Sequence, residues 1–321
     1  MLIADDGDGA AASAVLLFNR ATSVARIYSI AVHPRVRGRG LARALLRAAE
    51  KAALARDCAL LRLETRADNL AAQTLFANEG FAQVGHVPAY YEDGADALKL
   101  ERCLWGVSTR AASGLIRAPY YAQTLDFTCG AAALMMAMGA LDPSLRLDRR
   151  LELRLWREAT TVFMTSGHGG CGPFGLALAA HRRGFAVTVH APAGSAMFLD
   201  GVRDPEKKRV IDLVERDFLD DLASTTVAIS RSAVSTEVVA AHLKQGAIPV
   251  LLVSLYRLHG EKGPHWITVI GYDGHVFRVL DPMLPPASGA SPELSIGRRE
   301  LERMSRYGRS RQAAAVIVSK P

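Results

Sequence analysis

Cysteine is scarce in this chain of 321 residues, and its four copies lie far apart. None of them forms a Cys-x-x-Cys pair, so we expect neither a structural zinc site nor a disulfide framework. The sequence has no run of about 20 apolar residues, which excludes a predicted membrane-spanning helix. The first residues, MLIADDGDGA, are acidic and lack the apolar core of a signal peptide. We therefore expect a cytoplasmic protein with reduced thiols, no metal centre and no membrane partner.

The chain is basic, with a net charge of +7, but arginine is spread over many segments instead of being clustered. This spread argues against a nucleic-acid partner. Half of the residues are hydrophobic and 22% are charged, which is typical of a globular protein. The length favours two domains, whereas the oligomeric state stays open.

Residues 1–101 are predicted to form a short α/β unit. Asn69 is expected to cap the second helix of this unit, and Gly80 to end it. Residues 102–118 lose periodicity and include STRAASG, which is typical of a linker. The predicted strands cover residues 11–20, 24–32 and 58–65, and the predicted helices cover residues 41–57 and 69–80.

Residues 119–321 are predicted to form a second, α+β domain. Its last third is rich in β-branched residues and predicts consecutive strands. The predicted helices begin at Cys129 and cover about 148–160, the segment up to 183, 204–223 and 235–246; the predicted strands cover 185–190, 248–255, 265–272, 275–282 and 313–320.

A glycine- and arginine-rich turn follows a predicted strand of the first domain and precedes its long helix. Gly38 and Gly40 let backbone N–H groups approach an anion closely, and the helix start adds its positive dipole end. Arg35, Arg37 and Arg39 add positive charge. A pyrophosphate group fits this pattern, although an ordinary surface turn has the same composition.

On these residues, the first domain resembles the GCN5-related N-acetyltransferase family, and most of all its ribosomal-protein alanine acetyltransferase branch. The coenzyme A loop of that family, (Q/R)xxGx(G/A), is matched by Arg35, Gly38 and Gly40. The resemblance implies that acetyl-CoA binds here with its pantetheine along the strand at Ile30 and Val32. It further implies an α/β acetyltransferase fold that is truncated at the N-terminus, because the family's first strand and two helices do not precede residues 1–5 here. Either the start codon is placed too late, or this half is a reduced unit.

The stretch LETRADNLAAQTLFANEGF resembles another motif of the same branch. The resemblance implies that Glu64 is the general base for the acceptor amine and that Asn69 contacts the cofactor. The alternative for Glu64 is a surface carboxylate paired with Arg62 or Arg66.

The same motif departs from the branch at one position. The tyrosine that protonates the leaving thiolate falls on Phe76, which has no proton to donate. Tyr90 or Tyr91 is the alternative donor.

The stretch QTLDFTCGAA places Cys129 at the start of an apolar helix. A nucleophilic thiol needs a base, a group that orients the base, and donors for the oxyanion. His265 and Asp281, on successive strands, supply the base and its partner. The Gln123 side chain and the Cys129 N–H supply the donors. The alternative is a core cysteine, a core histidine and a turn aspartate.

The hairpin between the two strands decides whether His265 and Asp281 can meet. A three-residue loop ending at Gly274 would pair Gly271 with His275 and place His265 opposite Asp281. A two-residue turn would direct the two side chains to opposite faces of the sheet. The glycine at the last loop position favours the first arrangement.

With the order Gln, Cys, His, Asp, residues 117–321 resemble papain-fold cysteine peptidases, and most of all the double-glycine leader peptidases of bacteriocin precursors. Thr128 departs from that group, which commonly has aspartate there, and a long insertion separates the motifs. His168 and Cys171 lie in this insertion, where a glycine-rich helix start is expected instead of a metal site.

Together these resemblances imply a bifunctional enzyme with a peptide or protein substrate. Its first domain would acetylate a primary amine, such as a peptide N-terminus, and its second would cleave a peptide or leader sequence. Cleavage would expose an amine that acetylation then caps. One alternative is an acetyl-CoA-sensing module that controls the peptidase. Another is acyl or amide transfer, instead of hydrolysis, at Cys129.

Overall fold

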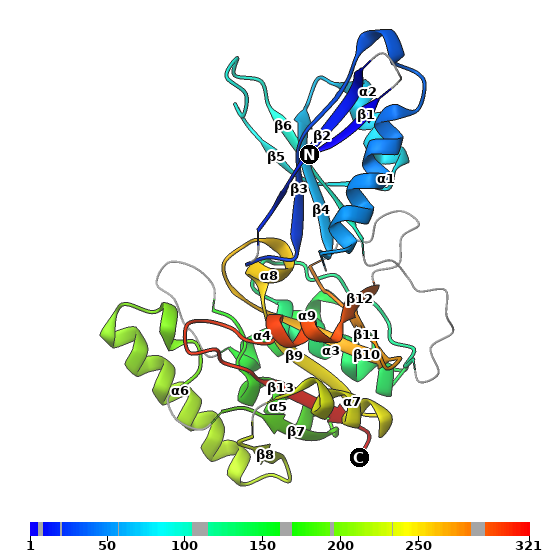
Figure 1. The fold of residues 1–321 in the computed structure, drawn as a ribbon. Helices are drawn as coiled ribbons and strands as arrows, with labels where there is room; N and C mark the ends of the chain where they lie inside the picture. Colours follow the sequence, from blue (N-terminus) through cyan, green and yellow to red (C-terminus); the bar gives the residue numbers. More distant parts are fainter. Residues whose placement is uncertain are drawn as a thin grey trace. The chain divides into compact units, whose positions relative to one another are not determined.

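The computed structural model describes residues 1–5, 9–19, 21–56, 58–104, 115–160, 169–192, 196–232, 234–283 and 293–321. The chain divides into two compact units (Figure 1). The first comprises Met1–Gly106 with Tyr256–Glu261, and the second comprises Val107–Leu255 with Lys262–Pro321. The predicted linker motif STRAASG and His168 lie outside the described residues. None of the helices in the described ranges has the length and apolar character needed to cross a membrane.

A mixed sheet of six strands, in the order β1-β2-β3-β4-β6-β5, forms the centre of the first unit as described. Only β3 and β4 pair in parallel, and the chain between them passes through helix α1, as a parallel crossover requires. The strands are β1 (Leu2–Asp5), β2 (Ala10–Phe18), β3 (Val24–Val32), β4 (Leu60–Arg66), β5 (Ala82–Val87) and β6 (Ala97–Cys103).

Two helices accompany this sheet, α1 (Leu41–Leu54) and α2 (Leu70–Asn78). α1 buries one face, including Leu45 and Leu46, while its other side is charged. The Asn69 side chain caps α2 by accepting a hydrogen bond from the Ala72 N–H at 3.1 Å. Gly80 follows the end of α2 with a φ of +80°. The predicted cap and stop of this helix are therefore confirmed.

The second unit contains a sheet of seven strands in the order β12-β11-β10-β9-β13-β7-β8. β7 and β8 pair in parallel, and the other neighbours pair antiparallel. The short strands β8 and β12 were not predicted from the sequence. The strands are β7 (Ala186–His190), β8 (Ala228–Ser230), β9 (Ile248–Ser254), β10 (Pro264–Tyr272), β11 (Val276–Leu280), β12 (Glu293–Gly297) and β13 (Ala315–Ser319).

Helix α3 is the most deeply buried helix of this unit and packs against β9, β10 and β13. Its side chains share one core with those of α4 and α5. Consecutive residues of β9 are buried, because α7 covers this strand as well. The helices of this unit are α3 (Cys129–Leu141), α4 (Arg149–Ala159), α5 (Pro173–His181), α6 (Pro205–Ala223), α7 (Thr236–Lys244) and α9 (Arg298–Met304). The short helix α8 (Leu255–His259) belongs, except for its first residue, to the first unit.

The contact between α4 and α5 depends on a glycine. A Cβ atom at Gly175 would lie 2.7 Å from both the Cα atom and the carbonyl oxygen of Ala159. Because this neighbour is backbone, we expect Gly175→Ala to lower the free energy of unfolding by about 1–3 kcal/mol. Urea unfolding measures the loss. Gly170→Ala is the control, since its Cβ would meet no heavy atom within 4 Å. Equal stability of the two variants would contradict the prediction.

Candidate functional site

Cys129 is the first residue of α3, at the positive end of the helix dipole. Its residue exposure is 9%. The helix that follows consists of alanine, methionine, leucine and glycine, and almost all of it is buried. Since a helix that is apolar on every side is held within a core, the position of the Cys129 thiol is held by packing.

His265 and Asp281 come together beside this helix start. His265 lies in β10, and Asp281 directly follows β11. The His265 Nε2 and the Asp281 Oδ1 lie 2.7 Å apart, and the two side chains are 2% and 0% exposed. The Asp281 Oδ1 also accepts a hydrogen bond from the Met283 N–H at 2.9 Å. The carboxylate is therefore buried and anchored on two sides.

The His265 imidazole contacts both the carboxylate and the thiol. Burial lowers the pKa of His265, but Asp281 and a hydrogen bond with Cys129 outweigh burial and raise this pKa to about 10. Because Nε2 contacts Asp281, Nδ1 is the ring nitrogen that can face the Cys129 sulfur. The structure thus brings Cys129, His265 and Asp281 into one buried chain of contacts.

The register predicted for the β10–β11 hairpin is wrong, although the two side chains meet. Tyr272 pairs with Phe277, so the loop has four residues instead of three. A bulge between Val269 and Gly271 then shifts the pairing by one residue. If the shifted register is continued, Asp281 lies opposite Ile267, diagonal to His265 and on the same face. Gly274 has the expected positive φ, +99°.

Gln123 belongs to the segment that leads into α3. Its backbone N–H donates to the Pro282 carbonyl at 2.8 Å, which ties this segment to the residue after Asp281. Its Nε2 donates to the Leu125 carbonyl at 3.0 Å and keeps a second hydrogen for another acceptor. Its buried Oε1 has no hydrogen-bond partner among the described residues.

A further buried carboxylate, Glu152 of α4, was missed by sequence reasoning. It accepts hydrogen bonds from Tyr121, Thr124 and Thr128, three residues of the segment before Cys129. One signal for it is present in the sequence. Glu152 occupies the buried face of α4 at helical spacing with Leu155 and Ala159, where an apolar residue is expected.

Cys171 is a buried structural thiol beside the start of α3. Burial, together with Cys129, raises the pKa of this thiol far above its usual range. Its carbonyl accepts a hydrogen bond from the Trp266 Nε1 at 3.0 Å, and a Cβ at Gly130 would lie 2.9 Å from its own Cβ. The predicted glycine-rich helix start is confirmed, because Gly172 caps α5.

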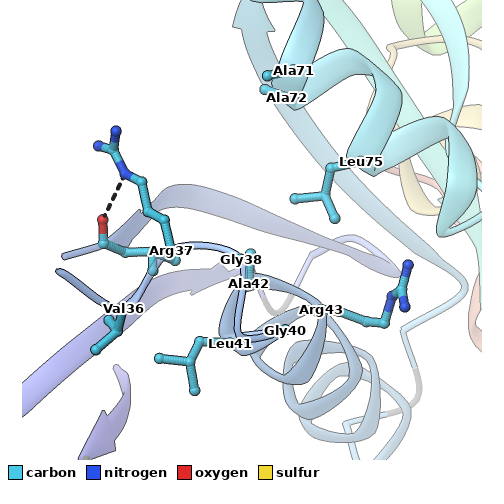
Figure 2. Close-up of a pocket in the computed structure, with 11 residues that line it drawn as sticks. Val36, Arg37, Gly38, Gly40, Leu41, Ala42, Arg43, Ala71, Ala72 and Leu75 are labelled. Carbon is cyan, nitrogen blue, oxygen red and sulfur yellow. Dashed lines mark hydrogen bonds between the residues drawn. The ribbon is translucent and has the colours of Figure 1, made fainter. Parts of the chain in front are cut away.

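The first unit has a pocket of about 500 Å³ between the start of α1 and the start of α2. Gly38 and Gly40 line it with φ values of +79° and +80°, and the Arg37 Nε donates to the Val32 carbonyl at 3.5 Å (Figure 2). The lining residues are Val32, Val36, Arg37, Gly38, Gly40, Leu41, Ala42, Arg43, Ala71, Ala72 and Leu75.

The pocket includes four of the eight residues that the sequence assigned to the cofactor. Leu75 and its neighbours on α2 also line it and were not predicted. Asn69 instead caps this helix. The four assigned residues in the lining are Val32, Arg37, Gly38 and Gly40, and the four outside it are Ile30, Arg35, Arg39 and Asn69.

Glu64 forms an ion pair with Arg26 of the neighbouring strand β3, with the Arg26 Nη2 2.7 Å from the Glu64 Oε2. Its predicted alternative partners are therefore wrong: Arg62 pairs with Glu101, and Arg66 with two aspartates. The pairing follows from the sheet, because β3 and β4 are adjacent parallel strands.

The structure also locates Phe76, at the position where the family has its tyrosine, and Tyr90, one of the two alternative donors. Phe76 is buried in the core and contacts Phe81, with ring centroids 5.7 Å apart. The Tyr90 hydroxyl accepts a hydrogen bond from the same Arg26 that pairs with Glu64, at 2.7 Å. Of the two tyrosines, Tyr90 therefore shares a neighbour with Glu64.

Comparison with protein families assigns both parts of the chain. Residues 118–319 match the Peptidase_C39 like family, and residues 1–81 match the Acetyltransferase (GNAT) family. The match to the first of these families covers more than half of the chain. No curated protein matches the chain significantly.

Several solved acetyltransferases are similar to about a third of this chain. Nourseothricin acetyltransferase is 28% identical over 31% of this chain and 61% of its own, with a TM-score of 0.30. Ard1 from Thermoplasma volcanium is 29% identical over 30% of this chain and 65% of its own, with a TM-score of 0.29. The ribosomal-protein-S18-alanine N-acetyltransferase from Escherichia coli is 31% identical over 33% of this chain and 69% of its own, with a TM-score of 0.30. The chain therefore spans less than two thirds of the length of the first two.

The His265–Asp281 contact predicts a pH-dependent stability. Because the folded-state pKa of His265 lies above its usual value of 6.5, the protonated ring stabilises the fold. This contribution is complete below pH 6.5 and is lost as the pH rises through about 10. We expect Asp281→Asn to lower the free energy of unfolding by about 3–5 kcal/mol near pH 6, and by less toward pH 10.

Urea unfolding across this pH range measures the difference between variant and wild type. Asp217→Asn, at an exposed position of α6, is the control and should show no such trend. A difference that stays constant or grows with pH would contradict the prediction.

Proposed function

Because this chain belongs to the Peptidase_C39 like family and carries a GNAT acetyltransferase domain at its N-terminus, we propose that it is a bifunctional enzyme. Its second unit is a cysteine peptidase that cleaves a peptide or leader sequence. Its first unit transfers acetyl from acetyl-CoA to a primary amine such as a peptide N-terminus. The buried contact chain of Cys129, His265 and Asp281 carries the first part of this proposal.

In the peptidase reaction, His265 holds the proton of the Cys129 thiol, and the thiolate attacks the peptide carbonyl carbon. The new carbon–sulfur bond leaves a negative charge on the carbonyl oxygen. Collapse of this intermediate breaks the carbon–nitrogen bond, and His265 protonates the leaving amine. His265 then takes a proton from water, which attacks the thioester and releases the acid and the thiol. Asp281 keeps the imidazole oriented throughout.

The oxyanion is stabilised by the Cys129 N–H and by the side-chain amide of Gln123. Two observations support these donors. Thr128, at the cap position of α3, makes no side-chain capping bond in the described part of the chain, and the N–H of Cys129, the first residue of the helix, has no acceptor within the helix. The Gln123 Nε2 has one hydrogen beyond its bond to Leu125.

For the acetyltransferase reaction, the N–H groups at Gly38 and Gly40 and the start of α1 would hold the pyrophosphate of acetyl-CoA. Val32 at the end of β3 would face its pantetheine, and the cofactor would supply the acetyl group as a thioester. Glu64 removes the proton of the acceptor amine, directly or through a water molecule. Tyr90 is the proton donor to the leaving thiolate. The pocket, with its two glycines at positive φ, is the observation that carries this second part.

We place the protein in the cytoplasm, where the thiol of Cys129 stays reduced, with peptides as partners and neither nucleic acid nor membrane as a ligand. The finer assignments are a ribosomal-protein-alanine-like acetyltransferase and a double-glycine leader peptidase. One alternative is a first unit that only senses acetyl-CoA and regulates the peptidase. This alternative is favoured by Phe76, which is buried and has no acidic proton to donate, and by the pairing of Glu64 with Arg26.

The peptidase assignment predicts an activated thiol. We expect iodoacetamide to alkylate Cys129 rapidly well below about pH 8.5, the usual range of thiol ionisation. His265→Ala should abolish this fast reaction, whereas His190→Ala, at another buried histidine, should retain it. Peptide mapping separates Cys129 from the other cysteines. Slow alkylation of Cys129 with an ordinary thiol profile in wild type would contradict the assignment. In a separate experiment, product analysis with an added amine distinguishes hydrolysis from amide transfer.

The cofactor assignment predicts that coenzyme A binds at the glycine turn. We expect Gly38→Ala to weaken coenzyme A binding by at least about tenfold, measured by isothermal titration calorimetry. Gly94→Ala is a matched control. Gly94 has the same φ of +79° and the same open space around its Cβ position, but lies outside the pocket.

Equal binding by the two variants, or none by wild type, would contradict the cofactor assignment. The sensing alternative is supported instead if coenzyme A binds and changes the peptidase rate while no peptide amine is acetylated.

A further inference from the structure

Glu152 has a carboxyl side chain with no exposed surface. Its Oε1 accepts hydrogen bonds from the Thr124 N–H at 2.8 Å and the Thr128 hydroxyl at 2.5 Å. Its Oε2 accepts from the Tyr121 hydroxyl at 2.9 Å and the Thr124 hydroxyl at 2.6 Å. All four donors belong to residues 121–128, the segment that contains Gln123 and directly precedes Cys129.

The four bonds explain how this carboxylate can be buried. An ionised carboxylate offers about four acceptor positions, and each is used here. Among the described residues no lysine, arginine or histidine forms an ion pair with Glu152, so the segment itself compensates the loss of water. The burial of Tyr121 and, to a lesser extent, its hydrogen bond with Glu152 raise the pKa of the Tyr121 hydroxyl. This donor therefore stays protonated.

The bonds also determine what Thr128 does. A threonine at a helix cap position usually accepts a hydrogen bond from an N–H group of the first turn. Here the Thr128 hydroxyl lies within hydrogen-bond distance of Glu152 and of the Leu125 carbonyl, at 2.8 Å, and makes no capping bond. The Thr128 side chain therefore takes up no N–H group of the first turn of α3.

The segment is fixed from a second side by the Gln123 N–H bond to Pro282. Glu152 therefore holds one side of the segment, while the residue after Asp281 holds the other. A change at Glu152 would free the donors on its side without touching the contact between His265 and Asp281.

We propose that Glu152 is a positioning residue that holds residues 121–128 so that the Gln123 amide and the Cys129 N–H converge on the oxyanion. This inference rests on the proposed peptidase function. It separates two properties of the site. Formation of the thiolate depends on His265, and stabilisation of the oxyanion depends on Glu152.

Two reagents measure these properties independently. Acetyl-glycyl-glycinal, a peptide aldehyde, forms a hemithioacetal with the Cys129 thiol, whose oxygen occupies the oxyanion position. The thiol adds to the aldehyde carbon, and its proton passes to that oxygen or to His265. The thiolate displaces iodide from iodoacetamide without forming an oxyanion, since the carbon–sulfur bond forms as the carbon–iodine bond breaks. Substitution of a residue that positions the oxyanion donors should therefore weaken aldehyde binding and leave the alkylation rate unchanged.

We expect Glu152→Gln to weaken aldehyde affinity by about tenfold or more, because an amide cannot accept all four hydrogen bonds. The alkylation rate of Cys129 should stay within about twofold of wild type. Glu215→Gln is the matched control, since Glu215 is a second buried glutamate, 8% exposed, and accepts from the Met197 N–H at 2.9 Å. Thr128→Val removes one of the four bonds, keeps the carboxylate and should change aldehyde affinity in the same direction.

Unchanged aldehyde affinity in Glu152→Gln and Thr128→Val would overturn the inference. An equal loss of aldehyde affinity and alkylation rate would also overturn it, because the whole site would then have changed. If wild type neither binds the aldehyde nor shows fast alkylation, the proposed function fails, and the inference fails with it.

Discussion

The burial of α3 is the constraint on which the second unit depends. A helix made of small and flexible apolar side chains can approach its neighbours closely on every side, and α3 does so. Gly130 leaves room for Cys171 and Trp266, and the Thr268 hydroxyl of β10 donates to the Ala133 carbonyl at 2.8 Å. Because β10 also carries His265, these contacts fix the distance between the thiol and the imidazole. The reactive geometry is thus set by packing, and the hydrogen bonds refine it.

The two units place their polar groups in opposite ways. In the second unit, Cys129, His265 and Asp281 are removed from water, where charges and hydrogen bonds act strongly on one another. In the first unit, the glycine turn at Gly38 and Gly40 is exposed and presents backbone N–H groups beside arginines. An anion that arrives from solvent needs such an open cradle, whereas proton transfer between a thiol and an imidazole needs a dry site. The placement of each set therefore matches the chemistry proposed for it.

Features that depend on a few neighbouring residues could be predicted from the sequence. Features that depend on contacts between distant segments could not. The cap at Asn69 and the stop at Gly80 are properties of a few neighbouring residues, and both are confirmed. The strand β12 is five residues long and is defined by its pairing with β11, so no local pattern marks it. Glu152 acquires its partners only when α4 packs beside the segment before Cys129, and the ion pair of Glu64 depends on which strand lies next to β4. Such contacts require the fold to be known first.

The bulge in β10 and the length of the loop between β10 and β11 together decide whether Asp281 faces His265. With a four-residue loop and no bulge, Asp281 would lie opposite Thr268 and point away from His265. The bulge restores the shared face, so the loop length and the bulge act together. The turn also constrains its own residues, because the Asp273 Oδ1 accepts from the His275 and Val276 N–H groups and Gly274 has a φ of +99°. A single insertion or deletion in this loop would turn Asp281 to the other face unless the bulge between Val269 and Gly271 changed with it. Variation at this tip of the hairpin is thus limited by the imidazole at the far end of the strand.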